Sequence, residues 1–481
     1  MMRIAIVHYH LKRGGVTRVI ENGLQALSQV GLPMDVVALC GEKPPEDCRV
    51  PCKVVPGLGY GNADEAINPS LLADRLQSAA REFLGHDPEL WHIHNHSLGK
   101  NPQMADAIIE LARRGCRLVL QVHDFAEDGR PVNYRMREDH LESESAYPVA
   151  SHIHYAVLNR RDYEVLRAAG VPESQLHWLP NPILIRELEY DADSVGNPSL
   201  DQIILYPVRA VRRKNFGELL LHAAIPSKRL LFMTTLGTTS KDFEESYRQW
   251  KDFASELDLH VNFEVCESYG LPFDSVLDHS HAVISTSVAE GFGLGFLEPW
   301  VYGKTLVGRD LPEITRDFRE LGIEFNRLYD SIPVPLTIFR FDEFRSRLKT
   351  AMKSFHDRYD RSPADDCMDQ WIAHSVQGMK IDFARLDEIA QREVIESVQS
   401  DYALQVNFRD HFNYEPESGQ VIDSNAALIE RELGLSAYGM RLRELYEQLL
   451  SSDPGGDFGY ADTERVLDAF FSVERFLPLR T

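Results

Sequence analysis

Short hydrophobic runs alternate with amphipathic stretches along the first 180 residues. The runs are rich in β-branched residues, and the stretches repeat their apolar positions every three or four residues. They predict strands at Arg3–His10, Asp35–Cys40, Leu90–His94, Arg117–His123, His152–Asn159 and Gln175–Leu179. They predict helices at Thr17–Val30, Leu71–Leu84 and Gln103–Arg114. Strands separated by helices indicate parallel βαβ units with right-handed crossovers.

A polar segment at Asp191–Asp201 interrupts this rhythm and is typical of a linker or a surface excursion. The alternation then restarts. It predicts strands at Gln202–Val208, Arg229–Leu236, His260–Val265 and Ala282–Ser285, and helices at Asn215–Ala224, Lys241–Leu257, Phe273–Asp278 and after Gly293. We therefore expect two doubly wound α/β domains in tandem, facing each other across a cleft. Further helices are predicted at Phe341–Arg358, Asp365–Val376, Asp382–Gln399, Ser424–Glu432, Met440–Leu450 and Asp462–Phe476.

Composition narrows the class of protein. The 481 residues include 51 Lys and Arg against 74 Asp and Glu, a net charge of −23, which argues against nucleic acid as a partner. No run is long and apolar enough to span a membrane, so we expect no integral membrane segment. Six cysteines without a Cys-x-x-Cys pair fit a reducing cytoplasm and suggest no metal site.

The strongest chemical signal is Glu290-Gly-Phe-Gly-Leu-Gly-Phe-Leu-Glu298, between a predicted strand and a predicted helix. Its glycines allow a ligand to approach the backbone closely. A helix beginning near Gly293 would offer N–H groups to an anion. The two carboxylates suit the hydroxyls of a sugar or ribose better than a phosphate. The alternative is a glycine-rich turn without a ligand.

Cations follow the first strand of the second domain, in Arg209-Ala-Val-Arg212-Arg213-Lys214. Parallel sheets bind ligands at the carboxyl ends of their strands, so this run could clamp a diphosphate. The alternative is a solvated basic turn. After the first strand of the chain, Gly14-Gly15 lacks the Gly-x-Gly-x-x-Gly fingerprint, which makes a nicotinamide enzyme improbable.

Histidines mark two strand ends of the first domain. His92, His94 and His96 would share one face of a strand, and His-x-His can bind zinc, but no clear further ligand follows. We therefore expect no metal. His123-Asp124 ends another strand, where the histidine is either structural or faces the other domain. Asp191-Ala-Asp193 lies in the linker and is interpreted as a solvated acidic turn.

Together and in this order, the motifs resemble the family-4 retaining glycosyltransferases of the GT-B fold. The resemblance rests on Gly14-Gly15, His123-Asp124, Arg209 with Lys214, and Glu290-x7-Glu298, with Trp178-Leu-Pro-Asn181-Pro182 and Gly303–Glu313 in their expected places. It covers roughly residues 1–400. Pro299 and Trp300 depart from the family pattern, in which small helix formers follow the second glutamate, and suggest a subgroup.

The resemblance implies a role for each motif. Arg209 and Lys214 would neutralise the donor diphosphate, and Glu298 would bind the ribose. Glu290, with the backbone of Gly291, Phe292, Gly293 and Leu294, would hold the transferred sugar. His123 would contact that sugar, and Gly14 and Gly15 would approach the phosphates. Arg209, Lys214, His123 and Glu290 form the expected catalytic set, with a nucleotide-sugar as substrate and neither a cofactor nor an essential metal.

The expected domains are residues 1–188 for the acceptor, 200–380 for the donor, and 381–400 as a helix crossing back to the first domain. An acidic helical extension follows over 401–481. It could brace the first domain, cover the acceptor side or mediate a homodimer.

Polar and cationic side chains after strands of the first domain suggest a small soluble acceptor, such as a sugar, sugar phosphate or sugar acid. They are Asn95, His96, Lys100, Asn101, Tyr134 and Arg135. Open alternatives are transfer to a lipid or cell-surface polysaccharide, a nucleotide-sugar epimerase or phosphorylase of the same fold, and a non-catalytic nucleotide-sugar-binding regulator.

Overall fold

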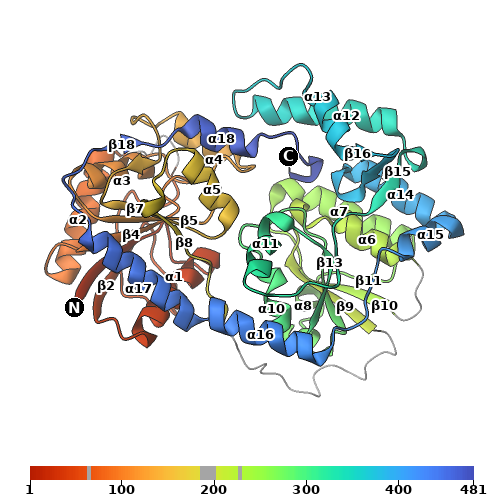
Figure 1. Cartoon of the computed structure of the whole chain (residues 1–481), viewed down its shortest axis with the longest axis horizontal. Helices are drawn as coiled ribbons and strands as arrows, with labels where there is room; N and C mark the ends of the chain where they lie inside the picture. Colours follow the sequence, from red (N-terminus) through yellow and green to blue (C-terminus); the bar gives the residue numbers. More distant parts are fainter. Residues whose placement is uncertain (62–66, 185–201, 226–229, 481) are drawn as a thin grey trace. The chain divides into compact units, whose positions relative to one another are not determined.

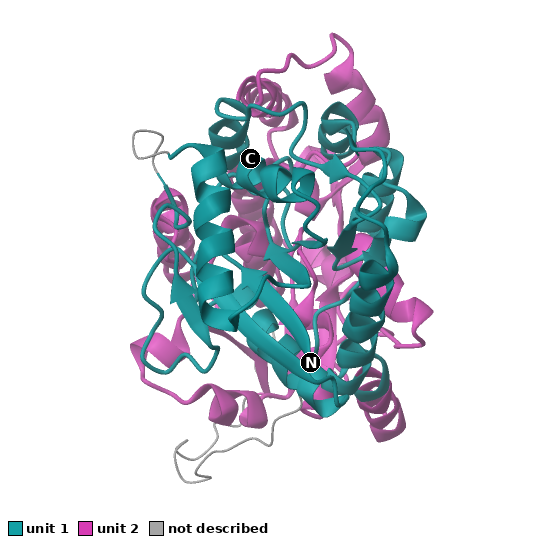
Figure 2. Ribbon diagram, turned by 90° about the vertical axis from the view of Figure 1, so that its left-hand side faces the viewer, with its two compact units in different colours: residues 1–184, 430–472 teal, residues 185–429, 473–481 magenta. Residues whose placement is uncertain are grey.

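The structure, a computed structural model, describes residues 1–61, 67–184, 202–225 and 230–480. The chain forms two compact units (Figure 2). The first unit consists of residues 1–184 and 430–472, and the second of residues 185–429 and 473–481. Each unit is built on a parallel sheet of its own. The expected linker and its Asp191-Ala-Asp193 turn lie outside the described residues.

The sheet of the first unit has seven parallel strands in the order β3-β2-β1-β4-β5-β7-β8 (Figure 1). The strands are β1 (Met2–Val7), β2 (Met34–Cys40), β3 (Cys52–Val54), β4 (Leu90–His94), β5 (Leu118–Val122), β7 (Ile153–Val157) and β8 (Leu176–Trp178). The central strands β4, β5 and β7 are buried along their whole length, which explains their nearly continuous apolar sequences.

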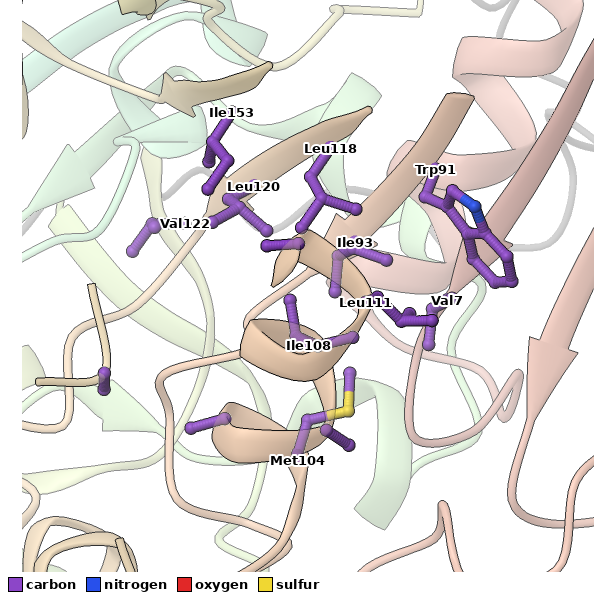
Figure 3. Close-up of a cluster of buried hydrophobic side chains, with 14 of the residues drawn as sticks. Val7, Trp91, Ile93, Met104, Ile108, Leu111, Leu118, Leu120, Val122 and Ile153 are labelled. Carbon is purple, nitrogen blue, oxygen red and sulfur yellow. The ribbon is translucent and has the colours of Figure 1, made fainter. Parts of the chain in front are cut away.

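Helices cover both faces of this sheet, and its two hydrophobic clusters show which helix lies on which face. On one face, Trp91, Ile93 and Leu120 pack against Ile108 and Leu111 of α3 (Figure 3). That face also receives α2, α5 and α18. The opposite face is covered by α1 and α17. These helices are α1 (Gly15–Gln29), α2 (Pro69–Leu84), α3 (Met104–Arg113), α5 (Arg160–Ala168), α17 (Leu435–Ser451) and α18 (Thr463–Phe470).

Residues 430–472 of the acidic C-terminal extension therefore complete the first unit. Leu442, Leu445 and Leu449 of α17 are buried in the cluster that α1 forms with the sheet. Residues of α18 fill the cluster on the other face. A two-stranded antiparallel sheet joins β18 (Gly459–Tyr460) to β6 (Pro148–Val149).

The return of the chain differs from the expected crossover at 381–400. Helix α14 (Glu388–Ser400) stays in the second unit, where Gln391 donates to Asn215 Oδ1 over 2.9 Å. Its apolar side is buried there, with Val394, Ile395 and Val398 inaccessible to solvent. The unit boundary instead falls inside α16 (Gly419–Leu433).

The second unit holds six parallel strands in the order β11-β10-β9-β12-β13-β14. They are β9 (Gln202–Arg209), β10 (Leu230–Leu236), β11 (Val261–Asn262), β12 (Ala282–Ser285), β13 (Thr305–Arg309) and β14 (Leu328–Tyr329). Because β9 and β12 are neighbours, the loops after them share one edge of the sheet. A small antiparallel sheet adds β15 (Pro333–Pro335), β16 (Val376–Gln377) and β17 (Lys380–Asp382).

Helices α6 (Phe216–Ala224) and α7 (Lys241–Glu256) follow the first two strands of this unit as expected. The other helices with four or more residues are α4 (Pro131–Glu138) in the first unit, and in the second α8 (Val265–Ser268), α9 (Phe273–His279), α10 (Glu298–Val301), α11 (Pro312–Glu320), α12 (Phe341–Asp357), α13 (Cys367–Ser375) and α15 (Tyr402–Arg409). Across the described ranges, no helix has the length and apolar character to cross a membrane.

Candidate functional site

Glu290 lies in the loop that follows β12, at the carboxyl edge of the second sheet. Its side chain is 14% exposed. One carboxylate oxygen contacts Lys214 Nζ, and the other accepts a hydrogen bond from Arg213 Nη1 over 2.8 Å. Arg213 Nη1 also donates to the carbonyl of Ala289 over 2.8 Å, which holds the guanidinium against this loop. One carboxylate therefore holds two cations.

The two cations come from a single 3₁₀ turn, Arg212–Lys214, that follows β9. Successive side chains of such a turn point about 120° apart, so the turn can spread three cations in different directions. Two hydroxyl groups hold this turn in place: Tyr206 Oη and Thr286 Oγ1 donate to the carbonyl of Lys214 over 3.0 and 2.9 Å. Asn215 then adopts a left-handed conformation, with φ of 51°, before α6 begins.

The charges of this cluster are fixed by burial and by each other. Burial raises the pKa of Glu290, but Lys214 and Arg213 outweigh it and bring the pKa down to about 2. Burial lowers the pKa of Lys214, and the Glu290 carboxylate opposes that shift. At neutral pH the site therefore presents an ionised carboxylate and two cations at the carboxyl edge of the sheet.

Arg209, the other predicted cation, sits apart from this cluster. Its guanidinium lies 3.7 Å from Glu267, and both side chains are largely exposed. Arg212 pairs with Glu388 at 3.7 Å. The sequence places Arg213 in the same basic run but gives no reason to prefer it, so its contact with Glu290 was missed. Only the turn geometry reveals it.

In the glycine-rich segment after Glu290, a helical turn begins at the expected place, with Gly293 as its N-cap, but it is short. A 3₁₀ turn, Leu294–Phe296, leads into α10, which has only four residues. Pro299 lies in the first turn of α10, and the left-handed Gly303, with φ of 69°, follows its end. The anion site expected at this N-terminus would therefore be built on a short 3₁₀ turn and the four-residue α10.

The position of Gly293 requires glycine, because its backbone conformation and its close packing both disfavour a side chain. Its φ of 90° is left-handed, and a Cβ there would lie 2.5 Å from Ile314 Cγ2. The segment thereby packs closely against α11. Leu294 is 38% exposed, while Phe292 is buried. Gly291 and Glu298 flank this packed region, with Glu298 as the first residue of α10.

In the first unit, Gly14 is the N-cap of α1 and Gly15 its first residue, two residues before the expected start at Thr17. A Cβ at Gly15 would meet no atom within 4 Å, so the space in front of this backbone is open within the unit. The first turn of α1 carries no acidic residue.

His123 follows β5 and is joined to the end of β4. Its Nε2 lies 2.9 Å from His94 Nδ1, and the two rings are nearly parallel. Asn95 Oδ1 accepts hydrogen bonds from the backbone N–H groups of His123 and Asp124 over 2.7 and 3.2 Å. Asn95 itself is left-handed, with φ of 56°. A non-glycine residue held in this conformation is characteristic of functional sites.

The histidines at this edge are neutral. Burial lowers the pKa of His8 to about 3, that of His92 to about 3 and that of His123 to about 4, and it lowers the pKa of His94 as well. The contact between His94 and His123 requires one ring to donate and the other to accept, which two protonated rings cannot do. These histidines therefore offer hydrogen bonds without charge, whereas Asp124, the residue after His123, pairs with Arg130 at 2.5 Å.

The residues expected to bind an acceptor differ in their burial and in their contacts. The Asn101 side chain donates to the carbonyls of Gly57 and Gly59 over 2.8 and 2.7 Å, and His96 Nε2 lies 3.0 Å from the carbonyl of Ala146. These two side chains and Asn95 are buried and hold loops in place. Lys100 lies over the ring of Tyr60, 5.4 Å from its centre.

Tyr134 and Arg135 lie on α4, away from the loops that Asn101 holds. Tyr134 is buried against Arg137, whose guanidinium is 5.4 Å from the centre of its ring. Arg137 is itself buried, pairing with Glu127 at 2.7 Å and donating to the carbonyl of Ser97 over 2.8 Å. Through that carbonyl, α4 supports the loop that contains Lys100.

The three histidines His92, His94 and His96 were expected on one face of a strand, and only the first two lie together. His92 and His94 stack with ring centres 4.4 Å apart, but His96 lies beyond β4 and turns to Ala146. Within the part of the chain that the structure describes, no three His, Cys, Asp or Glu side chains are placed to hold a metal ion.

Comparisons with known proteins bear on this geometry. No family model matches the chain. A curated protein, mannosylglucosyl-3-phosphoglycerate synthase from Petrotoga mobilis, is 28% identical over 351 residues, which cover 67% of each chain.

Among solved structures, sucrose-phosphate synthase from Thermosynechococcus elongatus aligns with a TM-score of 0.53 and 15% identity, covering 94% of this chain and 100% of that one. HepE from Anabaena in complex with UDP aligns with a TM-score of 0.52 and 12% identity, covering 93% of this chain and 100% of that one.

These comparisons confirm the predicted fold class, since the similar structures are GT-B glycosyltransferases. The resemblance to the family-4 enzymes agrees with them. Together with the curated relative, they support the class of the protein: a glycosyltransferase of the GT-B fold.

Proposed function

We propose that this protein moves a sugar from a nucleotide-sugar to a small soluble acceptor that carries a phosphate or carboxylate, with retention of configuration and without a metal. The observation that carries the proposal is the cluster of Glu290, Lys214 and Arg213 at the carboxyl edge of the second sheet. It combines a hydroxyl-binding carboxylate with diphosphate-binding cations.

The relatives support the two substrate classes. The curated relative is named for a product that contains a sugar and 3-phosphoglycerate. HepE was solved with UDP. A nucleotide-sugar donor and an acceptor of the sugar phosphate class are therefore the substrates that we infer for this chain.

In the proposed reaction, the bond between the anomeric carbon and the donor phosphate oxygen breaks. A bond from the acceptor hydroxyl oxygen forms on the same face of the sugar, and the hydroxyl proton passes to the departing phosphate. The largest task is to stabilise the negative charge that grows on the diphosphate. Lys214 and Arg213 supply fixed charge for it, and Arg209 extends the cationic edge. The donor would replace Glu290 as the partner of the cations.

Glu290 would then accept hydrogen bonds from the transferred sugar. Its pKa of about 2 keeps it ionised, so it serves as an acceptor rather than as a proton donor. Glu298 would bind the ribose. In the first unit, His123 would contact the sugar, with Asn95 and His94 fixing its backbone and ring.

The first experiment is a thermal-shift screen of UDP-, GDP- and ADP-sugars. At 100 times its dissociation constant, a bound nucleotide-sugar stabilises the protein by about 2.7 kcal/mol. Lys214→Ala should abolish that shift, and Lys241→Ala, which removes an exposed lysine at the start of α7, should retain it. Lack of a shift with any nucleotide-sugar would contradict the proposal.

Product analysis then separates the reaction classes. With the stabilising donor and a sugar phosphate acceptor, we expect a new glycoside with the anomeric configuration of the donor. Conversion of the donor without an acceptor would indicate an epimerase, and a requirement for inorganic phosphate would indicate a phosphorylase. Transfer to a polyprenyl lipid with none to soluble acceptors would assign the acceptor to the lipid class.

A further inference from the structure

A pocket within the second unit has Glu290 in its lining. The pocket, which we call the β12–β13 pocket, has a volume of about 160 Å³. Its lining combines the loops after β12 and β13 with the turn after β17 and the C-terminal segment 473–480. Glu290, Asp310, Glu313, Arg385, Arg475 and Arg480 are among the lining residues.

Most charges that line the pocket have an opposite charge beside them. Arg309 holds Glu218 and Asp382, each over 2.8 Å. Arg319 pairs with Asp310 at 2.8 Å, and Arg475 pairs with Glu313 at 2.6 Å. Glu290 is held by Lys214 and Arg213. These pairs neutralise each other and leave little attraction for a ligand.

Arg385 is different. Its Nη1 donates to Ser375 Oγ over 3.1 Å, and its Nη2 lies 3.1 Å from His374 Nε2 and 3.2 Å from the carbonyl of Glu474. None of these partners carries a negative charge, and Arg385 makes no ion pair with any residue that the structure describes. The guanidinium also lies over Trp371, 5.9 Å from the centre of the ring. It is held in place from several sides, while its charge is not balanced by a carboxylate in contact.

We propose that Arg385 anchors a phosphate or carboxylate borne by a sugar whose hydroxyls reach Glu290. This inference rests on the proposed function, in which Glu290 holds the transferred sugar, so the anionic group belongs either to that sugar or to the acceptor that meets it there. Arg385 is half-buried, and the loss of hydration lowers its pKa by more than the carboxylates of Asp382 and Glu474 raise it. A ligand that brings negative charge into contact with this cation therefore stabilises it. The planar fork of arginine suits a carboxylate or phosphate, which accepts two hydrogen bonds from it.

The remaining lining explains why the ligand must be more than an anion. Glu290, Asp310 and Glu313 stand on the same pocket, and an inorganic anion would face these carboxylates. A sugar acid or sugar phosphate avoids the conflict, because its hydroxyls donate to carboxylates while its anionic group lies on Arg385. The pocket thus selects a molecule that carries both kinds of group.

The test compares Arg385→Gln with Arg316→Gln, a control that removes an exposed arginine, paired with Glu320, from α11 of the same unit. Two acceptors are used with the donor found by thermal shift: glucosyl-3-phosphoglycerate, and the uncharged glucosylglycerol. In Arg385→Gln we expect the KM for the charged acceptor to rise about 10- to 100-fold, as befits a lost charge-assisted contact. The KM for the uncharged acceptor and the donor thermal shift should not change, and the control should match the wild type.

Two other outcomes would overturn the assignment. Equal losses with both acceptors, together with a lower unfolding temperature, would show that Arg385 only supports the fold through Ser375, His374 and Glu474. No change with either acceptor would show that the anion binds elsewhere. Arg385→Lys separates charge from fork geometry, since it should restore part of the affinity for the charged acceptor.

The donor is the other source of an anionic sugar, and it is tested directly. UDP-glucose and UDP-glucuronate are compared by thermal shift in both variants. A preference for the uronate that Arg385→Gln removes would place the anionic group on the donor sugar. If no nucleotide-sugar binds, the proposed function fails. The pocket is then judged by calorimetric titration with glucosyl-3-phosphoglycerate, for which binding lost in Arg385→Gln supports it and binding absent in the wild type overturns it.

Discussion

The two units use one architecture and opposite chemistry at their sheets. In the first unit, neutral histidines from β4 and from the loops after β1 and β5 contact each other through a hydrogen bond and through stacked or edge-to-face rings. In the second unit, the corresponding edge carries ion pairs, with Glu290 between Lys214 and Arg213 and Arg309 between Glu218 and Asp382.

This difference suits different ligands. A site of neutral rings can orient hydroxyls without attracting a particular charge, whereas fixed cations suit a diphosphate that becomes more negative during reaction. An acidic chain can bind such an anion because the charges of the second unit are gathered at one edge of its sheet.

The largest expected difference between the two units is in their stability to acid. A buried histidine whose pKa is lowered stabilises the fold above pH 6.5, and that contribution is lost as the pH falls, because the unfolded chain takes up the proton first. In the first unit, burial lowers the pKa of His92 and His96 to about 3, and that of His154 and His177 to about 4. Each such histidine removes up to about 1.4 kcal/mol per pH unit over this interval.

The second unit has fewer groups of this kind. His222 has a pKa lowered by burial to about 3, and the depressed pKa of Glu290 affects stability only below pH 4.5, where its contribution is lost toward pH 2. Hydrogen exchange followed by mass spectrometry from pH 7 to pH 4 should therefore show β4 and β5 losing protection before β12 and β13. The reverse order would break the comparison.

The ion pairs of the second unit should be costly to break. Arg309 is 3% exposed and makes two hydrogen bonds to Asp382 and three to Glu218. Arg309→Met would leave two carboxylates without their cation, which typically costs about 3–5 kcal/mol. Calorimetry should show a markedly lower unfolding temperature for the second unit in Arg309→Met. The surface variant Arg316→Met should leave that temperature unchanged. A small loss would mean that water or neighbouring groups replace the arginine.

A smaller loss in stability but a large one in activity is expected at Lys214. Lys214→Ala removes one of two cations from Glu290, and we expect transfer to fall about 100- to 1,000-fold, as for other groups that stabilise developing charge. The measurement is kcat/KM with saturating acceptor. Arg209→Ala, which removes the exposed cation beside Glu267, should cost less. An equal loss in both variants would show that the diphosphate lies nearer to Arg209.

The sequence predicts much of this fold because the central strands have strong local signals. The expected strands Leu90–His94 and Ala282–Ser285 match β4 and β12 in both bounds, since they are short runs, mostly apolar or aromatic, that are buried along their whole length. Weaker elements fail. The strand expected at His260–Val265 shortens to Val261–Asn262, because the left-handed Glu264, with φ of 57°, begins a helical turn.

The candidate site was predictable only to the level of its motifs. That Lys214 and Glu290 share an edge follows from parallel strands that end in chemistry-bearing loops. The partner of Arg213 depends on the exact turn after β9. The β12–β13 pocket is lined by loops and a C-terminal segment that lie far apart in the chain. No local sequence pattern connects them.

The smallest prediction concerns the polar contact by which the C-terminal extension reaches the histidines. His92 Nε2 lies 2.9 Å from the carbonyl oxygen of the Gln121 side chain, so this nitrogen carries the proton, and Nδ1 accepts the hydroxyl of Tyr446 over 2.7 Å. Tyr446→Phe keeps the ring of α17 in the core but leaves that nitrogen without a donor, which should cost about 1 kcal/mol. Tyr402→Phe, in which the tyrosine is 73% exposed, is the matched control. The loss should appear in unfolding of the first unit at pH 7 and stay nearly constant down to about pH 4, because burial lowers the pKa of His92 to about 3 and the ring remains a neutral acceptor over that range.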